Sequence, residues 1–395
     1  MNRNELGLVM TSRALRLLDS LPGYTDSADI VKTVADLRRD GHPADLVSAV
    51  LTQSRLRSRA ASKFGEFASR MLFTEAGLEQ ATRLRVAALH AGRYQAAGIR
   101  RVADLGCGIG ADALAFAALD LEVQAVEKDE VTAAIASYNL TPFTNATVSC
   151  GDAQEHDLSG VDAVYLDPAR RTAGHGDTRR LPDPRDYSPA LDFAFGLAEA
   201  LPTGVKLGPG FDRSLIPDEA EAQWISVDGQ LVENGLWFGS LARDKIRRSA
   251  LVLRGSQSAE LVAENDSDDA EIGGLSQYLY EPDGSVIRAR LIGDLARALG
   301  AHMVSEQIAY LSADHLIDSP FVTAFSVTDT LPSDESKLKK ELRRRGIGRL
   351  EIKKRGVDVD PAVLRKRLSL SGDNEATLFL TRVAGRHTAI LAERV

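Results

Sequence analysis

The chain has 395 residues, of which 44% are hydrophobic and 26% are charged, which is the composition of a folded globular protein with two or three domains. The net charge of −8 argues against a general nucleic-acid binder, although a total can hide local segregation of charge. Only two cysteines occur, Cys107 and Cys150, which excludes a disulfide scaffold and a four-cysteine zinc ribbon. No apolar run approaches the roughly 18–20 residues of a membrane span, and the N-terminus lacks the apolar core of a signal peptide. We therefore expect a cytoplasmic protein that does not enter a membrane.

Residues 1–95 predict a helical N-terminal region. Apolar residues recur at helical spacing between residues 14 and 51, and 60–98 holds almost no helix breaker. From residue 96 to 255, short apolar strands alternate with helices, which is typical of an α/β fold with a doubly wound, Rossmann-like parallel sheet. The expected strands are 102–106, 122–127, 146–150, 161–167, 204–208, 222–228, 236–241 and 249–254.

The C-terminal third predicts two further parts. Residues 255–274 are polar, acidic and poor in aromatic side chains, so we interpret them as a linker. A small α+β connecting unit is expected at 275–318, with a strand at 286–291. Residues 319–395 then predict an independent α+β module, because strand patterns alternate there with two amphipathic helix patterns.

Charge is strongly segregated in this last module. Residues 337–367 hold thirteen Lys and Arg against four Asp and Glu, a net charge of +9, although the whole chain is acidic. One interpretation is a solvated helix face. The other is a surface that binds the phosphates of RNA, with Lys353, Lys354 and Arg355 as candidate contacts.

The clearest motif is DLGCGIG, Asp104–Gly110, between a predicted strand and a predicted helix. Its glycines, Gly106, Gly108 and Gly110, let the backbone turn tightly and approach a ligand. The spacing differs from the G-x-G-x-x-G of dinucleotide sites, which disfavours a nicotinamide dehydrogenase, and a pyrophosphate would not favour a carboxylate there. Asp104 instead suits a cationic or zwitterionic ligand, such as an amino-acid tail.

Further acids follow the next three strands. Glu127 ends the second strand, where a carboxylate can accept hydrogen bonds from both hydroxyls of a ribose. Asp152 follows the third strand, where it can accept a hydrogen bond from an adenine amino group, and Asp167 ends the fourth. Because open α/β sheets bind ligands at the carboxyl ends of their strands, these acids predict a single site.

These motifs together resemble those of the class I S-adenosylmethionine-dependent methyltransferases, over about residues 70–255. The resemblance implies S-adenosylmethionine as the cofactor. It also implies a cofactor-covering helix within residues 72–89, where Gln80 and Thr82 are candidate contacts. The cofactor-binding residues that it implies are Asp104, Gly106, Cys107, Gly108, Gly110, Glu127, Asp152, Ala153 and Asp167.

The DPAR segment, Asp167–Arg170, bears on the methylated atom. It resembles the Asp/Asn-Pro-Pro-aromatic signature of enzymes that methylate amino groups, but Arg170 replaces the aromatic residue that stacks on a flipped base. It also resembles the Asp-Pro-Pro-Arg of uridine C5 methyltransferases, but no cysteine follows Cys150 to attack the ring. Because the sulfonium methyl group is already electrophilic, transfer needs mainly an unprotonated nucleophile held in line, and we expect that nucleophile to be a nitrogen of an RNA base. The candidate catalytic residues are Asp167, Pro168 and Arg170.

The whole layout resembles a bacterial group of these enzymes that ends in a THUMP-like domain. The resemblance is carried by LEQAT (78–82), LDPARR (166–171), VKLGPGFD (205–212) and IGRLEIKKRGVDVDP (347–361). THUMP domains bind RNA, so the resemblance implies an rRNA or tRNA substrate. Arg171, in the basic loop after DPAR, is a further candidate RNA contact.

Two other functions stay open. One is a small-molecule methyltransferase with an incidental basic module. The other is a noncatalytic, RNA-associated protein that binds S-adenosylmethionine, because the DPAR segment departs from known signatures. The seven histidines show no metal-ligand spacing, so no metal is expected. No pattern predicts the oligomeric state.

Overall fold

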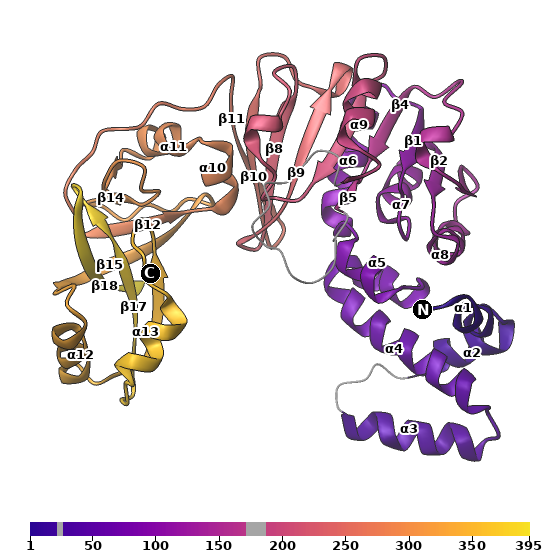
Figure 1. Ribbon diagram of the computed structural model, residues 1–395, viewed down its shortest axis with the longest axis horizontal. Helices are drawn as coiled ribbons and strands as arrows, with labels where there is room; N and C mark the ends of the chain where they lie inside the picture. Colours follow the sequence, from indigo (N-terminus) through magenta and orange to yellow (C-terminus); the bar gives the residue numbers. More distant parts are fainter. Residues whose placement is uncertain (22–26, 171–186) are drawn as a thin grey trace. The chain divides into compact units, whose positions relative to one another are not determined.

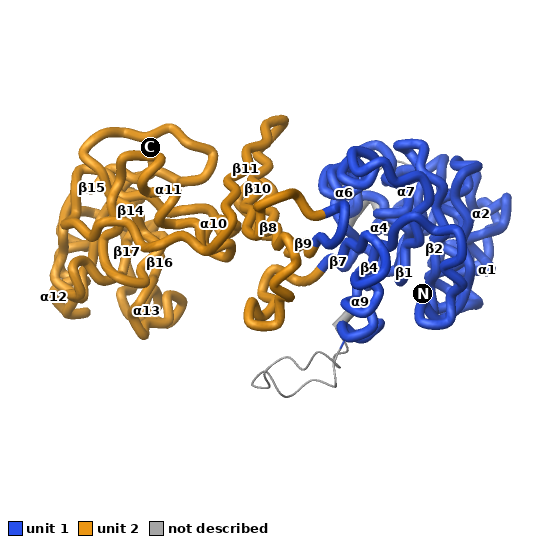
Figure 2. Tube along the Cα trace, turned by 90° about the horizontal axis from the view of Figure 1, so that it is seen from above, with its two compact units in different colours: residues 1–206, 237–241 blue, residues 207–236, 242–395 orange. Residues whose placement is uncertain are grey.

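The computed structural model describes residues 1–21, 27–170 and 187–395. The chain divides into two compact units, coloured separately in Figure 2. The first unit comprises Met1–Lys206 and Trp237–Leu241, and the second comprises Leu207–Leu236 and Ala242–Val395. Within the described residues, no helix is both long and apolar enough to cross a membrane.

Helices fill the N-terminal part of the first unit, as predicted (Figure 1). Asn2 and Thr11 cap the first two helices, because each side chain accepts a hydrogen bond from a backbone N–H three residues later. The apolar sides of these helices pack into one core through Leu6, Leu18 and Val50. The helices are α1 (Arg3–Val9), α2 (Ser12–Ser20), α3 (Ser27–Arg39), α4 (Ala44–Phe64), the 3-10 helix η1 (Gly65–Arg70), α5 (Glu75–Gln80) and α6 (Leu84–Ala96).

Parallel strands follow, and they confirm the predicted doubly wound sheet. β1 pairs with β2 and β4, β2 pairs with β3, and β4 pairs with β7, all in parallel register. The elements are β1 (Arg101–Leu105), α7 (Ala111–Ala118), β2 (Glu122–Glu127), α8 (Glu130–Leu140), β3 (Ala146–Cys150), η2 (Ala153–Glu155), β4 (Ala163–Leu166), β5 (Ala169–Arg170), β6 (Tyr187–Ser188), α9 (Leu191–Ala198) and β7 (Thr203–Leu207). They contribute to a nine-stranded sheet with the order β11-β10-β8-β9-β7-β4-β1-β2-β3.

Aromatic side chains fill one face of the parallel strands. Tyr94, Phe116, Tyr165 and Trp237 pack with ring centroids 4.8–6.5 Å apart. Gly204 faces this cluster, and a Cβ atom there would lie 2.6 Å from the Tyr94 hydroxyl. The close packing fixes β4 and β7, whose carboxyl ends carry two of the charged side chains described below.

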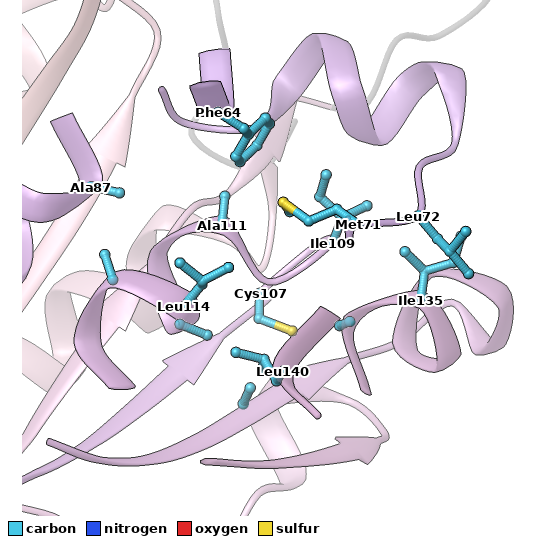
Figure 3. Close-up of a cluster of buried hydrophobic side chains, with 14 of the residues drawn as sticks. Phe64, Met71, Leu72, Ala87, Cys107, Ile109, Ala111, Leu114, Ile135 and Leu140 are labelled. Carbon is cyan, nitrogen blue, oxygen red and sulfur yellow. The ribbon is translucent and has the colours of Figure 1, made fainter. Parts of the chain in front are cut away.

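A neighbouring part of the core lies around the turn that follows β1 (Figure 3). Cys107 and Ile109 of the turn pack there with side chains from α7 and α8. Helix α5 approaches the turn closely at Gly77, where a Cβ atom would lie only 2.5 Å from Cγ2 of Ile109. The glycine therefore allows α5 to rest on the turn.

The second unit corrects two of the predictions from sequence. Residues 257–263, within the predicted linker, form β11, which pairs antiparallel with β10. The residues of β11 are all exposed or half-buried, so their polar composition resembles that of a linker. Residues 286–291, predicted as a strand, lie largely in helix α10, because Asp283 caps the first turn through the N–H of Ser285. The elements between residues 213 and 299 are η4 (Arg213–Leu215), β8 (Glu221–Val227), β9 (Gln230–Phe238), η5 (Gly239–Leu241), β10 (Arg248–Arg254), β11 (Gln257–Ala263), α10 (Gly284–Ala289) and α11 (Ile292–Leu299). Of these, η5 and the end of β9 belong to the first unit.

A seven-stranded sheet with the order β13-β14-β12-β15-β18-β17-β16 forms the C-terminal part of the second unit. Helices α12 and α13 cover one face through Leu338, Leu342, Leu364 and Leu368, and the aromatic residues of the other face form a separate core. The elements are β12 (Tyr278–Pro282), β13 (His302–Met303), β14 (Leu311–Ala313), β15 (Val322–Leu331), α12 (Glu335–Arg344), β16 (Ile347–Lys354), α13 (Pro361–Leu368), β17 (Asn374–Val383) and β18 (Arg386–Arg394).

Candidate active site

The turn between β1 and α7 is built on three glycines with left-handed backbone angles. Gly106, Gly108 and Gly110 have φ values of 90°, 56° and 84°. Residues with a Cβ atom rarely adopt these angles, so glycine is needed for the chain to reverse here. Gly110 also precedes α7 as its N-cap residue and packs against Leu140. The turn therefore leads directly into the N-terminus of a helix.

Glu127 is held at the end of β2 by backbone groups. The N–H of Gly108 donates to Oε2 at 3.0 Å, and the N–H of Asp129 donates to Oε1 at 2.8 Å. Each carboxylate oxygen has more than one lone pair, so both can still accept hydrogen bonds from a ligand. This is the arrangement expected of a residue that receives two ribose hydroxyls.

Cys107 faces the core rather than the solvent. Its side chain belongs to the hydrophobic cluster of Figure 3 and is 9% exposed. Burial raises the pKa of the thiol well above its ordinary value, and the negative charges of Asp104 and Glu127 add to the effect. A thiol in this state is a poor nucleophile, so Cys107 packs the turn.

Asp104 is the most unusual residue of the site. It is 1% exposed, and within the described residues neither carboxylate oxygen has a hydrogen-bond partner. Burial raises its pKa well above the ordinary value, and the charges of Asp112 and Asp167 act in the same direction. A buried carboxylate without a partner is costly, and a ligand that brings a positive group would offset this cost. The ammonium group of S-adenosylmethionine fits this requirement.

Asp167 and Lys206 form an ion pair at the carboxyl ends of β4 and β7. The Lys206 side chain is 12% exposed, and its ammonium also lies 3.4 Å from the carbonyl oxygen of Gln80. A lysine cation is costly to bury without partners, so these oxygens hold it in place. The sequence analysis did not single out Lys206, although it lies within VKLGPGFD.

Lys63 fixes the C-terminal end of α5. Its ammonium donates to the carbonyl oxygens of Leu78, Glu79 and Ala81 at 2.7–2.9 Å. Burial lowers the pKa of Lys63 to about 8, and the positive charges of Arg83 and Lys206 act in the same direction. Helix α5 is thus anchored by cations at the end that carries the predicted contact Gln80.

A buried polar network lies behind the turn, and the sequence analysis missed it. Asp112 accepts hydrogen bonds from Thr82 at 2.7 Å and pairs with His90 at 2.9 Å, and His90 also contacts the Tyr165 hydroxyl at 3.1 Å. Although burial alone would raise the pKa of Asp112, these hydrogen bonds and the charge of His90 lower it. Thr82, between α5 and α6, therefore bonds to α7 in the interior, which differs from the predicted cofactor contact.

The adenine-side candidates lie beyond β3. Asp152 caps η2 through the N–H of Gln154 at 3.0 Å and pairs with the exposed Lys128 at 2.8 Å. Its side chain is 33% exposed, so its oxygens can also meet a ligand. Ala153 is buried next to it.

The DPAR segment is described only in part. Pro168 is buried. The backbone of Arg170 lies in β5 and pairs with Tyr187 of β6. The side chain of Arg170 and the whole of Arg171 lie outside the described residues.

The three basic candidates of the second unit differ in their surroundings. The Lys353 ammonium is 18% exposed and lies 2.7 Å from Glu281, and the Arg355 guanidinium lies 5.2 Å from the Tyr310 ring centroid. Lys354 is exposed, and in the described parts of the chain its ammonium forms no side-chain hydrogen bond or ion pair. Lys353 and Arg355 therefore stabilise the module internally, and Lys354 is the best placed of the three for an external ligand.

The described residues contain no group of three or more His, Cys, Asp or Glu side chains that could hold a metal.

Comparison with family models identifies two segments of the chain. Residues 322–394 match a family described as THUMP domain-like, and residues 10–60 match a domain of unknown function, DUF8688. The first match spans β15 to β18 and includes both basic helices. This confirms the predicted THUMP-like module.

Two comparisons extend over most of the chain. An uncharacterized S-adenosylmethionine-dependent methyltransferase of Mycobacterium tuberculosis, found in strains CDC 1551 and H37Rv, is 34% identical over 336 residues, which cover 83% of this chain and 90% of the relative. A crystal structure described as a methyltransferase of Porphyromonas gingivalis W83 has the same fold, with a TM-score of 0.73 and 20% identity over 100% of this chain and 99% of the other. The protein therefore belongs to the S-adenosylmethionine-dependent methyltransferases, and S-adenosylmethionine is its cofactor.

Proposed function

We propose that this enzyme methylates a nitrogen of an RNA base, in rRNA or tRNA, and that its THUMP domain-like module binds the RNA. The observation that carries the proposal is a set of exposed lysines on the module that form no ion pair with any described residue. They are Lys337 and Lys340 of α12, Lys354 at the end of β16, and Lys366 of α13. For none of them do the described residues supply a side-chain hydrogen bond or an ion pair.

The two helices that carry most of these lysines are joined to each other. Lys339 of α12 donates to the carbonyl oxygen of Arg367 at 2.7 Å, and Arg343 donates to that of Ser369 at 3.0 Å. Other cations of the module are already paired with acids, such as Arg349 with Glu375. Unpaired lysines on two joined helices form a basic surface of the kind that binds a phosphate backbone.

Methyl transfer requires little from the protein beyond positioning of the target nitrogen. S-adenosylmethionine supplies a methyl group that is already electrophilic when it is bound. The protein must then hold an unprotonated nitrogen in line, which can account for much of the rate. In this proposal the Asp167 carboxylate accepts a hydrogen bond from the N–H of the target, and the carbonyl of Pro168 orients it.

Replacement of Lys337, Lys340, Lys354 and Lys366 by glutamine is expected to weaken RNA binding and to flatten its salt dependence. Each lost phosphate contact lowers the slope of log K against log[salt] by about 0.7–0.9, so four contacts lower it by about 3. The measurement is RNA binding by fluorescence anisotropy across a salt series.

The matched control is the double variant Arg349→Gln with Glu375→Gln, which removes an exposed ion pair without changing the net charge. It should leave the slope unchanged. If the lysine variant also keeps the wild-type slope, the four lysines form a solvated surface and the RNA part of the proposal is wrong.

Methyl transfer itself is tested with S-adenosylmethionine that carries a tritiated methyl group. The enzyme is incubated with total RNA, and separately with the small-molecule fraction, from cells that lack the gene. Label in N-methylated nucleosides of the RNA digest supports the proposal. Label only in the small-molecule fraction would support a small-molecule methyltransferase, and label in neither, with cofactor binding intact, would support a noncatalytic role.

A further inference from the structure

We propose that Lys206 binds the carboxylate of the methionine tail of S-adenosylmethionine, opposite the ammonium site at Asp104. The tail is a zwitterion, so a site that holds it firmly needs a negative group for the ammonium and a positive group for the carboxylate. Asp104 meets the first need, as argued above. The sequence motifs do not assign the second group.

Strand register places Lys206 and Asp104 on the same face of the sheet. Asp104 of β1 is level with Tyr165 of β4, and Tyr165 is level with Gly204 of β7. Neighbouring residues at one level of a parallel sheet point to the same face, and so do residues two positions apart along a strand. Lys206 therefore points to the same face as Asp104. It lies two residues beyond Gly204, closer to the carboxyl ends of the strands, where ligands bind.

The surroundings of Lys206 are suited to carboxylates. Its ammonium already binds one carboxylate, that of Asp167, although its side chain is only 12% exposed. An ammonium group donates three hydrogen bonds, so a second carboxylate can replace the long 3.4 Å contact with the carbonyl oxygen of Gln80 while Lys206 keeps Asp167. The positive charge of Lys206 also opposes the rise in the pKa of Asp104.

Two of the neighbouring cations, Lys63 and Lys128, are less suitable. The Lys63 ammonium is already bound by three backbone carbonyl oxygens at the end of α5. Lys128 pairs with Asp152 after β3, on the side predicted for adenine. Arg83 lies close enough to Lys63 to lower its pKa, so it is the rival that the experiment must separate from Lys206.

The test compares ligands that differ only in the tail. S-adenosylhomocysteine carries the full zwitterion, its decarboxylated analogue lacks the carboxylate, and methylthioadenosine lacks the tail. Calorimetry with the full-length wild-type protein should show that the decarboxylated ligand binds at least about tenfold more weakly than S-adenosylhomocysteine, the scale of one charge-assisted hydrogen bond. Equal affinity of wild type for these two ligands would overturn the proposal without any variant.

Lys206→Gln should weaken binding of S-adenosylhomocysteine by about 10- to 100-fold and leave the affinities for the other two ligands nearly unchanged. Lys206→Arg, which keeps the charge, should recover part of the loss. Lys128→Gln is the matched control, because it removes another lysine–aspartate pair of the same sheet and should not change the ratio between ligands. Thermal unfolding of each variant establishes that it is folded.

Two outcomes of this series would contradict the proposal. One is an equal loss for all ligands in Lys206→Gln, which would mean that Lys206 only supports the fold. The other is a carboxylate-specific loss in Arg83→Gln instead, which would assign the carboxylate to Arg83. The proposal concerns the cofactor alone, so it does not depend on RNA being the substrate.

Discussion

Replacement of Asp104 by asparagine is expected to weaken S-adenosylmethionine binding by about 100-fold and to leave the cofactor-free protein at least as stable as wild type. The asparagine side chain has the same shape but cannot provide a charge for the ammonium group. In the cofactor-free protein it also removes a buried carboxylate that lacks a partner within the described residues. Calorimetric titration and thermal unfolding measure the two effects.

The pH dependence follows from the raised pKa of Asp104. An acid whose pKa is higher in the folded state contributes stability below its unfolded pKa, near 3.9, and this contribution is lost as the pH rises through the folded value. The stability of wild type relative to Asp104→Asn should therefore fall as the pH rises through this window. Saturating cofactor should reduce the fall, because the ammonium favours the ionised carboxylate.

Two results would contradict this account of Asp104. An unchanged cofactor affinity in Asp104→Asn would mean that the ammonium binds elsewhere. A large loss of cofactor-free stability in the same variant would mean that the carboxylate has a structural partner. Asp157→Asn is a suitable control, because Asp157 is an exposed acid that bonds only to Ser159 within the described residues.

Replacement of Asp167 by asparagine is expected to lower kcat for methyl transfer by about 100- to 1,000-fold, the usual range when a positioned group that accepts a hydrogen bond or proton is lost. The affinity for S-adenosylhomocysteine should be kept, because Lys206 remains available to the cofactor. Single-turnover transfer of tritiated methyl groups to RNA gives the first quantity, and calorimetry gives the second. A loss of affinity with an unchanged single-turnover rate would instead assign Asp167 to cofactor positioning.

The parts of the site that the sequence predicted are local in the chain. Asp104 and the three glycines lie within seven residues, and the strand and the helix that flank them have clear apolar patterns. Glu127 was predicted because it ends the next strand, and a parallel sheet brings strand ends together. The structure adds that backbone N–H groups fix its carboxylate.

The parts that the sequence did not predict depend on contacts between distant residues. The partner of Lys206 lies 39 residues earlier in the chain, and Thr82 bonds to an acid 30 residues later. Lys353 looked like a surface cation in a basic run, yet its partner Glu281 lies 72 residues away. A helix cap at Asp283 outweighed the β-branched residues after it, so a predicted strand became α10.

The most direct test of the central claim is mass-spectrometric nucleoside analysis of total RNA from cells with and without the gene, and from cells that carry the gene with Asp104→Asn. The account predicts that one N-methylated nucleoside of rRNA or tRNA is lost on deletion, returns with the wild-type gene and does not return with the variant. An unchanged set of methylated nucleosides in all three strains would contradict RNA as the substrate.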